Sequence, residues 1–189
     1  SGGYTFHFES TTFATNAPAV AAFKRALNSW ICNTHINWTL GANTAINTAI
    51  NDGLFVIRFD VGAELPAGVL GVTSSSFKGC VNPGVDTVWT VADIDVSYDG
   101  GAGGVGLSWQ FGPAAPSASQ IDFESVNVHE LGHTHGLQHI ILSTAVMQFS
   151  SGGGTSKRVL SVTNDIAAGN FIMAKSTVAH GGCKPSPMI

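Results

Sequence analysis

The run of eleven residues from His129 to His139 restricts the possible folds of this chain more than any other feature. Its sequence is HELGHTHGLQH. His129 and His133 are four residues apart, so on a helix their side chains point in nearly the same direction. His139 cannot lie on that straight face, but Gly136 can take a positive φ, end the helix and return the chain. The spacing therefore predicts three imidazoles around one zinc ion, with Glu130 beside the first.

A histidine-rich surface helix could match the first part of this pattern by chance. The chain has 7 histidines and 23 glycines among 189 residues. A glycine and a third histidine would therefore rarely fall at both of the further positions without a structural reason. The zinc interpretation is favoured.

The predicted set of three ligands leaves one coordination position of the zinc ion open for catalysis. Three neutral imidazoles leave the fourth position of a tetrahedral zinc ion open to water, whose pKa the ion lowers toward neutrality. Glu130 is next to a ligand without being one, so its carboxylate can accept the proton of that water as it attacks a carbonyl. The same carboxylate can then protonate a leaving amine. His135 is expected to be exposed or at the rim of a cleft, because a fourth protein ligand would close the open position.

The composition suits one secreted, turn-rich domain spanning residues 1–189. Hydrophobic residues make up 44% of the chain and charged residues only 11%, and the net charge is −4. This charge argues against nucleic acid or an anionic membrane as a partner, and no apolar run is long enough to span a membrane. We expect a monomer. The start at Ser1, without Met or a signal peptide, suggests a mature or trimmed product.

Three cysteines, Cys32, Cys80 and Cys183, allow at most one disulfide within the chain. They are far apart and form no CxxC pair, so a cysteine zinc site is not expected. A bridge that closes a long loop restricts the unfolded chain most. We therefore favour a Cys32–Cys183 bridge over a Cys32–Cys80 bridge.

Hydrophobic periodicity predicts alternating helices and strands. An amphipathic helix should follow a cap at Asn16 or Thr15, and the zinc helix should end near Thr134. A Gly/Ser tract at residues 150–156 should be a flexible loop. The expected strands cover residues 4–8, 36–40, 53–59, 67–73 and 88–98, the expected helices cover residues 19–32, 121–134 and 166–176, and residues 43–50 should form a short helix or turn.

The extended histidine motif resembles the signature of the metzincin zinc metalloproteases. The segments VLGVT, DIDV and DFESV before it are most similar to bacterial matrixin-type catalytic domains. The resemblance implies an α+β fold of the metzincin, or zincin-like, type. Its twisted sheet would have five mostly parallel strands and an antiparallel edge strand, with two long helices and a C-terminal helix. The active-site cleft would lie between an upper subdomain, about 1–136, and a lower subdomain, about 137–189.

The resemblance also implies roles for residues outside the motif. Met147, eight residues after His139, stands where the family has its Met-turn, a methionine forming an apolar floor beneath the zinc. The pocket beyond the scissile bond would lie between the zinc helix and residues 145–155. An extended substrate would pair antiparallel with an edge strand, placed at Gly68, Val69, Leu70, Gly71, Val72 and Thr73.

Three positions depart from the family pattern, and one of them is His135, which stands where the family usually has an apolar residue. Ile140 stands where many subfamilies carry a diagnostic polar residue, so the motif does not define a subfamily. Phe149 occupies a position where some metzincins place a tyrosine that reaches the zinc. The phenylalanine has no hydroxyl, so no such ligand is expected here.

The resemblance implies a secreted zinc-dependent metalloendopeptidase that cleaves protein or peptide substrates. One alternative is a catalytically silent, zinc-containing binding or adhesion module, and another is a zinc hydrolase acting on a non-peptide amide. The intact Glu130 favours an enzyme, because a structural zinc site has no use for a general base. The third histidine, His139, favours a peptidase.

A calcium site is a further possibility. Asp93, Asp95 and Asp99 precede a glycine-rich loop and could supply oxygen ligands to Ca²⁺. Their spacing matches no EF-hand loop, and alternating carboxylates on a strand usually face water.

Overall fold

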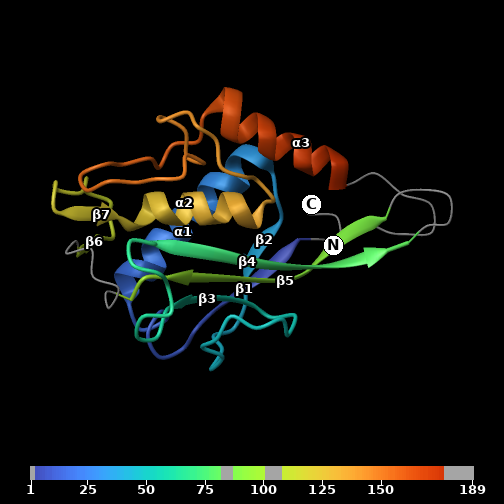
Figure 1. Ribbon diagram of the computed structural model, residues 1–189, viewed down its shortest axis with the longest axis horizontal. Coiled ribbons are helices and arrows are strands. Elements are labelled where there is room, and N and C mark those ends of the chain that lie inside the picture. Colours follow the sequence, from blue (N-terminus) through green and yellow to red (C-terminus); the bar gives the residue numbers. More distant parts are fainter. Residues whose placement is uncertain (1–2, 82–86, 101–107, 177–189) are drawn as a thin grey trace.

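A twisted five-stranded sheet forms one layer of the fold (Figure 1). The computed structural model describes residues 3–81, 87–100 and 108–176. The strand order is β2-β1-β3-β5-β4, and every neighbouring pair is parallel except β4 with β5. The predicted mostly parallel sheet with an antiparallel edge strand is therefore confirmed. The strands are β1 (Tyr4–Phe8), β2 (Trp38–Leu40), β3 (Phe55–Phe59), β4 (Gly71–Cys80) and β5 (Val88–Tyr98).

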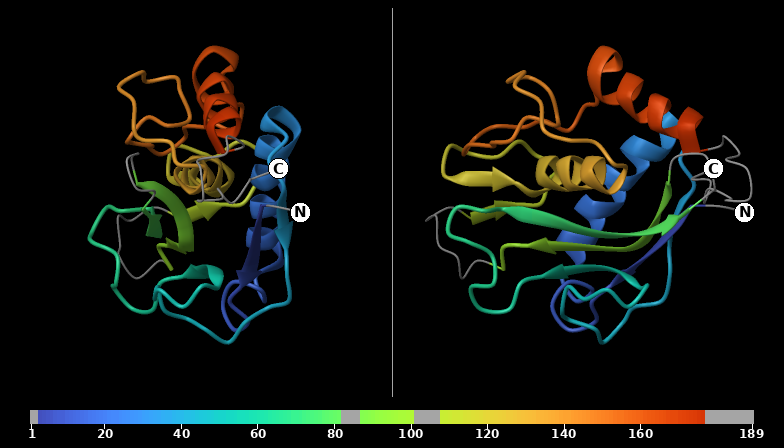
Figure 2. Two further views of the ribbon diagram at one scale, coloured as in Figure 1. Left: turned by 90° about the vertical axis from the view of Figure 1, so that its right-hand side faces the viewer. Right: turned by 45° about the vertical axis from the view of Figure 1, so that its right-hand side comes forward.

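Two long helices, α1 (Ala17–Thr34) and α2 (Phe123–Thr134), cover one face of this sheet (Figure 2). Asn16 caps α1 by accepting a hydrogen bond from the backbone N–H of Ala19 at 3.2 Å, and Pro18 follows in the first turn. A π-helical turn (Val162–Ile166) leads into the C-terminal helix α3 (Ala167–Ser176), which lies beyond α1 and α2. Among the described residues, no helix is long and apolar enough to cross a membrane.

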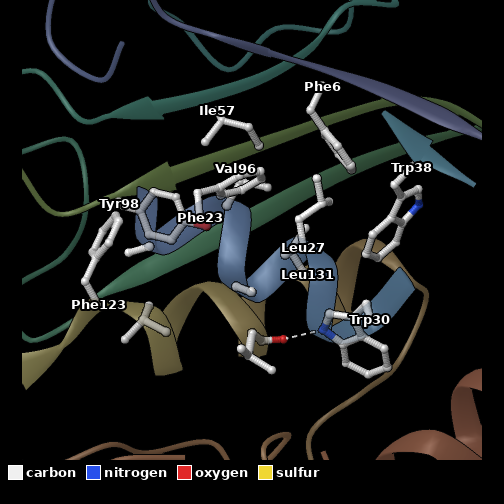
Figure 3. Close-up of a cluster of buried hydrophobic side chains, with 14 of the residues drawn as sticks. Phe6, Phe23, Leu27, Trp30, Trp38, Ile57, Val96, Tyr98, Phe123 and Leu131 are labelled. Carbon is white, nitrogen blue, oxygen red and sulfur yellow. Dashed lines mark hydrogen bonds between the residues drawn. The ribbon is translucent and has the colours of Figure 1, made fainter. Parts of the chain in front are cut away.

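The core lies between the helices and the sheet (Figure 3). Phe23, Leu27 and Trp30 recur at helical spacing along α1 and are buried against the sheet and α2. The indole Nε1 of Trp30 donates a hydrogen bond to the backbone oxygen of Val128 at 2.9 Å. This contact fixes α1 against α2 one residue before His129, so the core positions the helix that carries the predicted zinc ligands.

A small parallel pair of strands, which the sequence analysis did not predict, leads into α2. It consists of β6 (Ser108–Gln110) and β7 (Gln120–Asp122). Because β7 ends where α2 begins, α2 starts at Phe123 rather than at residue 121.

The edge strand β4 differs from its prediction. The sequence suggested a strand at residues 67–73, but Gly68, Val69 and Leu70 precede the strand, which continues to Cys80. The polar residues Ser74–Ser76 gave no strand signal. Their conformation comes from pairing with β5, which continues along the full length of β4 with one irregularity between Ser76 and Phe77. Residues 43–50 contain no helix.

The predicted Cys32–Cys183 bridge is wrong, because Cys32 is a free, exposed thiol on α1. Cys80, at the end of β4, is disulfide-bonded. Cys183 lies outside the described residues. Spacing along the chain could not show that the Cys32 side chain points to solvent.

The carboxylate of Glu9 organises the turn after β1. The side chain is fully buried and accepts five hydrogen bonds from Thr11, Thr12 and Phe13, at 2.5–3.3 Å. Burial alone would raise its pKa, but together these hydrogen bonds outweigh burial and lower the pKa from 4.5 to about 2. The folded state therefore favours the ionised carboxylate.

We expect Glu9→Gln to lower the free energy of unfolding by about 2–3 kcal/mol at neutral pH, since hydrogen bonds to a charged group are lost. A depressed pKa stabilises the fold fully above the unfolded value of 4.5, and this stabilisation is lost as the pH falls toward 2. Urea unfolding of both proteins at pH 7 and pH 3 tests this. The difference between them should shrink at pH 3, and an equal difference at both values would contradict the assignment.

Candidate metal centre and cleft

Three histidine side chains converge at one point beside α2. The Nε2 atoms of His129, His133 and His139 lie 3.0–3.1 Å from one another. The Nδ1 atom of His129 lies 2.8 Å from the backbone oxygen of Val146, and that of His133 lies 2.8 Å from the oxygen of Leu137. A carbonyl only accepts, so these Nδ1 atoms carry the protons and the lone pairs of Nε2 point inward.

This arrangement fits a tetrahedral metal ion. At zinc–nitrogen distances of 2.0–2.1 Å, two tetrahedral ligands are about 3.3 Å apart, close to the separation of these nitrogens. Burial lowers the pKa of His129 to about 4 and also lowers the pKa of His133, so both are neutral ligands at neutral pH. Among the described residues, the three histidines form the group of His, Cys, Asp and Glu side chains that could hold a metal ion.

A tight turn after α2 returns the chain toward the helix. Gly136 has a φ of 91°, and its N–H donates to the oxygen of His133, while the N–H of Leu137 donates to the oxygen of Gly132. These two bonds form the glycine-based end of a helix known as the Schellman motif. The turn allows His139 to reach the two histidines on α2.

The methionine predicted beneath the metal is buried against α2. Met147 is 2% exposed, and Ile140 donates a backbone hydrogen bond to its oxygen at 2.9 Å. A Cβ atom added at Gly132 would lie 2.2 Å from the sulfur of Met147. Gly132 therefore lets the methionine approach the helix between the two histidine-bearing turns.

Glu130 is buried at the bottom of the cleft and is held by the edge strand. The hydroxyl of Thr73 donates to Oε2 of Glu130 at 2.7 Å, and a Cβ atom at Gly71 would lie 3.0 Å from Oε1. Burial raises the pKa of Glu130 to about 7, although the hydrogen bond from Thr73 opposes this shift. The carboxylate can therefore exchange a proton near neutral pH.

The histidines and Glu130 line an open cleft of about 870 Å³. One wall is the segment of residues 68–73 together with Ser75 and Phe77 of β4, and the other includes Val146 and residues 148–151. Phe149 lies in this second wall and is largely exposed. The structure thus brings together the predicted triad, the predicted base and the predicted edge segment.

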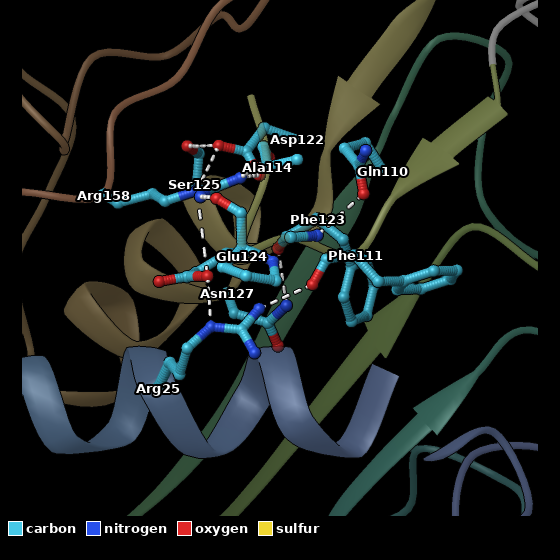
Figure 4. Close-up of polar contacts among 12 residues, drawn as sticks. Arg25, Gln110, Phe111, Ala114, Asp122, Phe123, Glu124, Ser125, Asn127 and Arg158 are labelled. Carbon is cyan, nitrogen blue, oxygen red and sulfur yellow. Dashed lines mark hydrogen bonds and ion pairs between the residues drawn. The ribbon is translucent and has the colours of Figure 1, made fainter. Parts of the chain in front are cut away.

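A polar network joins the start of α2 to the second wall of the cleft (Figure 4). Arg158 binds both carboxylate oxygens of the fully buried Asp122, at 2.8 and 2.9 Å. Asp122 also accepts from the hydroxyl of Ser125 at 2.7 Å, and this hydroxyl accepts from the backbone N–H of Lys157 at 2.6 Å. The chain at residues 157–158 is therefore fixed to the helix that carries the histidines.

The predicted flexible Gly/Ser tract is anchored by backbone contacts. The N–H of Gly154 donates to the oxygen of Gln120 at 3.0 Å. A Cβ atom at Gly153 would lie 2.2 Å from the oxygen of Ala118. These two glycines thus permit close packing of the tract on the loop before β7.

The prediction that His135 is exposed or at the cleft rim is wrong. Its ring is fully buried, 5.5 Å from the ring centre of Trp30 and 5.7 Å from that of Trp38. Burial lowers its pKa to about 4, so the imidazole is neutral at neutral pH. His135 directly follows α2, and its ring packs against Trp30 of α1 and Trp38 of β2. Because histidine is a polar residue, the sequence did not indicate this burial.

Asp93 and Asp95 do not face water as isolated strand carboxylates usually do. Both are buried and accept backbone hydrogen bonds, Asp93 from Gly53 at 3.0 Å and Asp95 from Val56 at 3.1 Å. They hold the start of β3 against β5. Together with Asp99 they form no group that could hold a metal within the described part of the chain, and calcium binding remains a prediction.

Several residues that shape the site were missed by sequence reasoning. Thr73 was assigned only to the edge strand, yet its hydroxyl holds Glu130. Gly71 and Gly132 do not form turns. A larger residue at either position would come too close to Glu130 or Met147, respectively. Gly132 was the one signal in the sequence for such a contact, since a glycine within a helix often marks a close approach of another segment.

The fold and the histidine site together define a metzincin-type catalytic domain. The sequence pattern that describes the Peptidase_M10 family, matrixin, matches residues 3–169, so the chain belongs to the matrixin family of zinc metalloproteases. Metalloendoproteinase 5-MMP of Arabidopsis thaliana is 26% identical over 166 residues. The match covers 87% of this chain and 42% of that protein, so the chain spans less than half the length of its relative.

Proposed function

We propose that this chain is a secreted zinc-dependent metalloendopeptidase that cleaves protein or peptide substrates. The observation that carries the proposal is the buried Glu130, which lines the same open cleft as three converging histidines. The residues up to about 136 would form the upper side of the cleft and those from about 137 its lower side, within one catalytic domain. Secretion is proposed from the composition and the family.

In this proposal His129, His133 and His139 bind the zinc ion, with Met147 beneath them. Bound zinc would polarise the substrate carbonyl and make a water more acidic. Glu130 accepts the proton of the attacking water at its carboxylate and delivers it to the amine of the leaving peptide. Burial raises the pKa of this carboxylate, which helps it hold the proton between the two steps.

The edge of β4 would bind the substrate main chain. Among the described strands β4 is the last in the sheet order and pairs with β5, so its other edge offers N–H and C=O groups to which a new strand could bond. An extended peptide that pairs antiparallel along this edge gains affinity with little demand on its sequence. The side chain after the scissile bond would enter the space between α2 and residues 145–155.

Metal removal tests the proposed function. We expect the chain to cleave casein, to lose this activity with a zinc chelator and to regain it when zinc is restored. Circular dichroism would verify that the chelated protein is still folded. A folded, zinc-loaded protein that cleaves neither casein nor a library of unfolded peptides would contradict the proposal and favour a silent binding module.

Thr73→Val should lower kcat about tenfold with little change in KM, because the hydroxyl that holds Glu130 is removed while the backbone of β4 is kept. Steady-state kinetics with one peptide substrate would measure kcat and KM separately. Thr73→Ser keeps the hydroxyl and should restore most of the activity. A change confined to KM would show that Thr73 acts on substrate binding instead.

A further inference from the structure

Two aromatic side chains are exposed on the hairpin formed by β4 and β5. Phe77 is 55% exposed and Trp89 is 66% exposed. Figure 1 shows that this hairpin runs along α2 and continues past the end of that helix. Large aromatic residues exposed side by side on a strand pair are a common feature of binding surfaces.

Phe77 lies on the face of β4 that borders the cleft. Side chains alternate along a strand, so Thr73, Ser75 and Phe77 share one face. That face is the one toward α2, because the hydroxyl of Thr73 bonds to Glu130. The surface that begins beside the catalytic carboxylate therefore continues along β4 to Phe77.

A bulge in β5 brings Trp89 onto the same face. Simple alternation would place Trp89 with Asp93 on the opposite side of the sheet. The register shift between Ser76 and Phe77 moves the pairing by one residue, so Trp89 lies opposite Gly79. A Cβ atom at Gly79 would lie 3.2 Å from the Trp89 ring, so the indole lies over this glycine, diagonal to Phe77.

The two aromatic residues extend the catalytic cleft. Phe77 lines the cleft that contains Glu130 and the histidines. It also lines, with Trp89, a second hollow of about 520 Å³. Because Phe77 belongs to both, a peptide lying along β4 would pass from one into the other without leaving the surface.

We propose that Phe77 and Trp89 form a distal subsite for an apolar side chain of an extended protein substrate, on the N-terminal side of the scissile bond. This inference rests on the proposed endopeptidase function. An antiparallel substrate places the residues before the scissile bond next to the later residues of β4. At about 3.4 Å per residue, Phe77 lies about four residues beyond Thr73 and Gly79 about six. The subsite therefore binds the fourth to sixth residue before the bond.

Three quenched fluorescent peptides test the subsite. All share one cleavage sequence identified from casein fragments, and the short peptide begins three residues before the bond. The two long peptides add an upstream extension carrying either leucine and phenylalanine or serine. We expect kcat/KM for the apolar long peptide to exceed that for the serine peptide about tenfold, which corresponds to about 1.4 kcal/mol.

The combined Phe77→Ser and Trp89→Ser substitutions should reduce this ratio to about one. Phe171→Ser, which removes an aromatic residue on α3 that is 61% exposed, should leave the ratio unchanged. Circular dichroism would show that each variant is folded. A ratio of one in the native chain, or a tenfold ratio that survives the double substitution, would overturn the subsite. Failure to cleave any of the peptides would count against the endopeptidase function itself.

Discussion

Glu130→Gln is expected to lower kcat/KM for peptide hydrolysis by about 10²–10⁴-fold, the usual contribution of a general acid–base group. The amide has nearly the same shape and can still accept the hydrogen bond from Thr73, but it cannot take up a proton from water. Because Glu130 is not a member of the histidine triad, zinc affinity should stay the same. The measurement is steady-state kinetics together with zinc content for each protein.

Glu64→Gln is the matched control for this experiment. Glu64 pairs with Arg58 and lies outside the residues that line the cleft. The control should retain native activity. Activity of Glu130→Gln within tenfold of the native chain, with zinc bound, would show that another group accepts the proton.

The second large effect is expected at Gly132. Replacing glycine by alanine inside a helix usually stabilises a protein, by roughly 0.5–1 kcal/mol. Here the added Cβ atom would lie 2.2 Å from the sulfur and 3.0 Å from the terminal methyl carbon of Met147, and 3.2 Å from a ring carbon of Trp30. The methionine is buried and has little space to move. Gly132→Ala should therefore destabilise the fold by about 1–3 kcal/mol, as overpacking does.

Thermal unfolding and zinc titration would measure this effect. Zinc affinity should fall as well, because Gly132 lies next to His133 and the displaced Met147 packs against the turn of α2 that carries this histidine. Gly152→Ala is the control, since the nearest atom to its new Cβ would be 3.9 Å away. If Gly132→Ala is as stable as the native chain, the close packing of Met147 on α2 does not constrain the site.

The parts of the fold that follow from local pattern were predictable from the sequence. The alternating residues of β1 and β5 define strands whose ends match those in the structure, Tyr4–Phe8 and Val88–Tyr98. The helix of the histidine motif was predictable because spacing of four residues is a property of the helix itself. The family signature then implied a mostly parallel sheet with an antiparallel edge strand.

The remaining features depend on contacts between distant segments. The second half of β4 is polar and becomes a strand only by pairing with β5. His135 is buried because two tryptophans from α1 and β2 surround it. The hydrogen bond from Thr73 to Glu130 joins residues 57 positions apart. No local pattern encodes such partners.

X-ray absorption spectroscopy of the zinc-loaded chain would test whether the three histidines hold zinc in an open site. The spectrum separates sulfur ligands from nitrogen and oxygen ligands, and the scattering from outer ring atoms gives the number of bound imidazoles. We expect three imidazole nitrogen ligands at about 2.0–2.1 Å and one oxygen ligand from solvent, the pattern of an open catalytic site. Loss of a nitrogen ligand in His139→Ala would assign the third histidine. Four protein ligands, or a sulfur ligand, would indicate a closed structural site and rule out the proposed catalytic one.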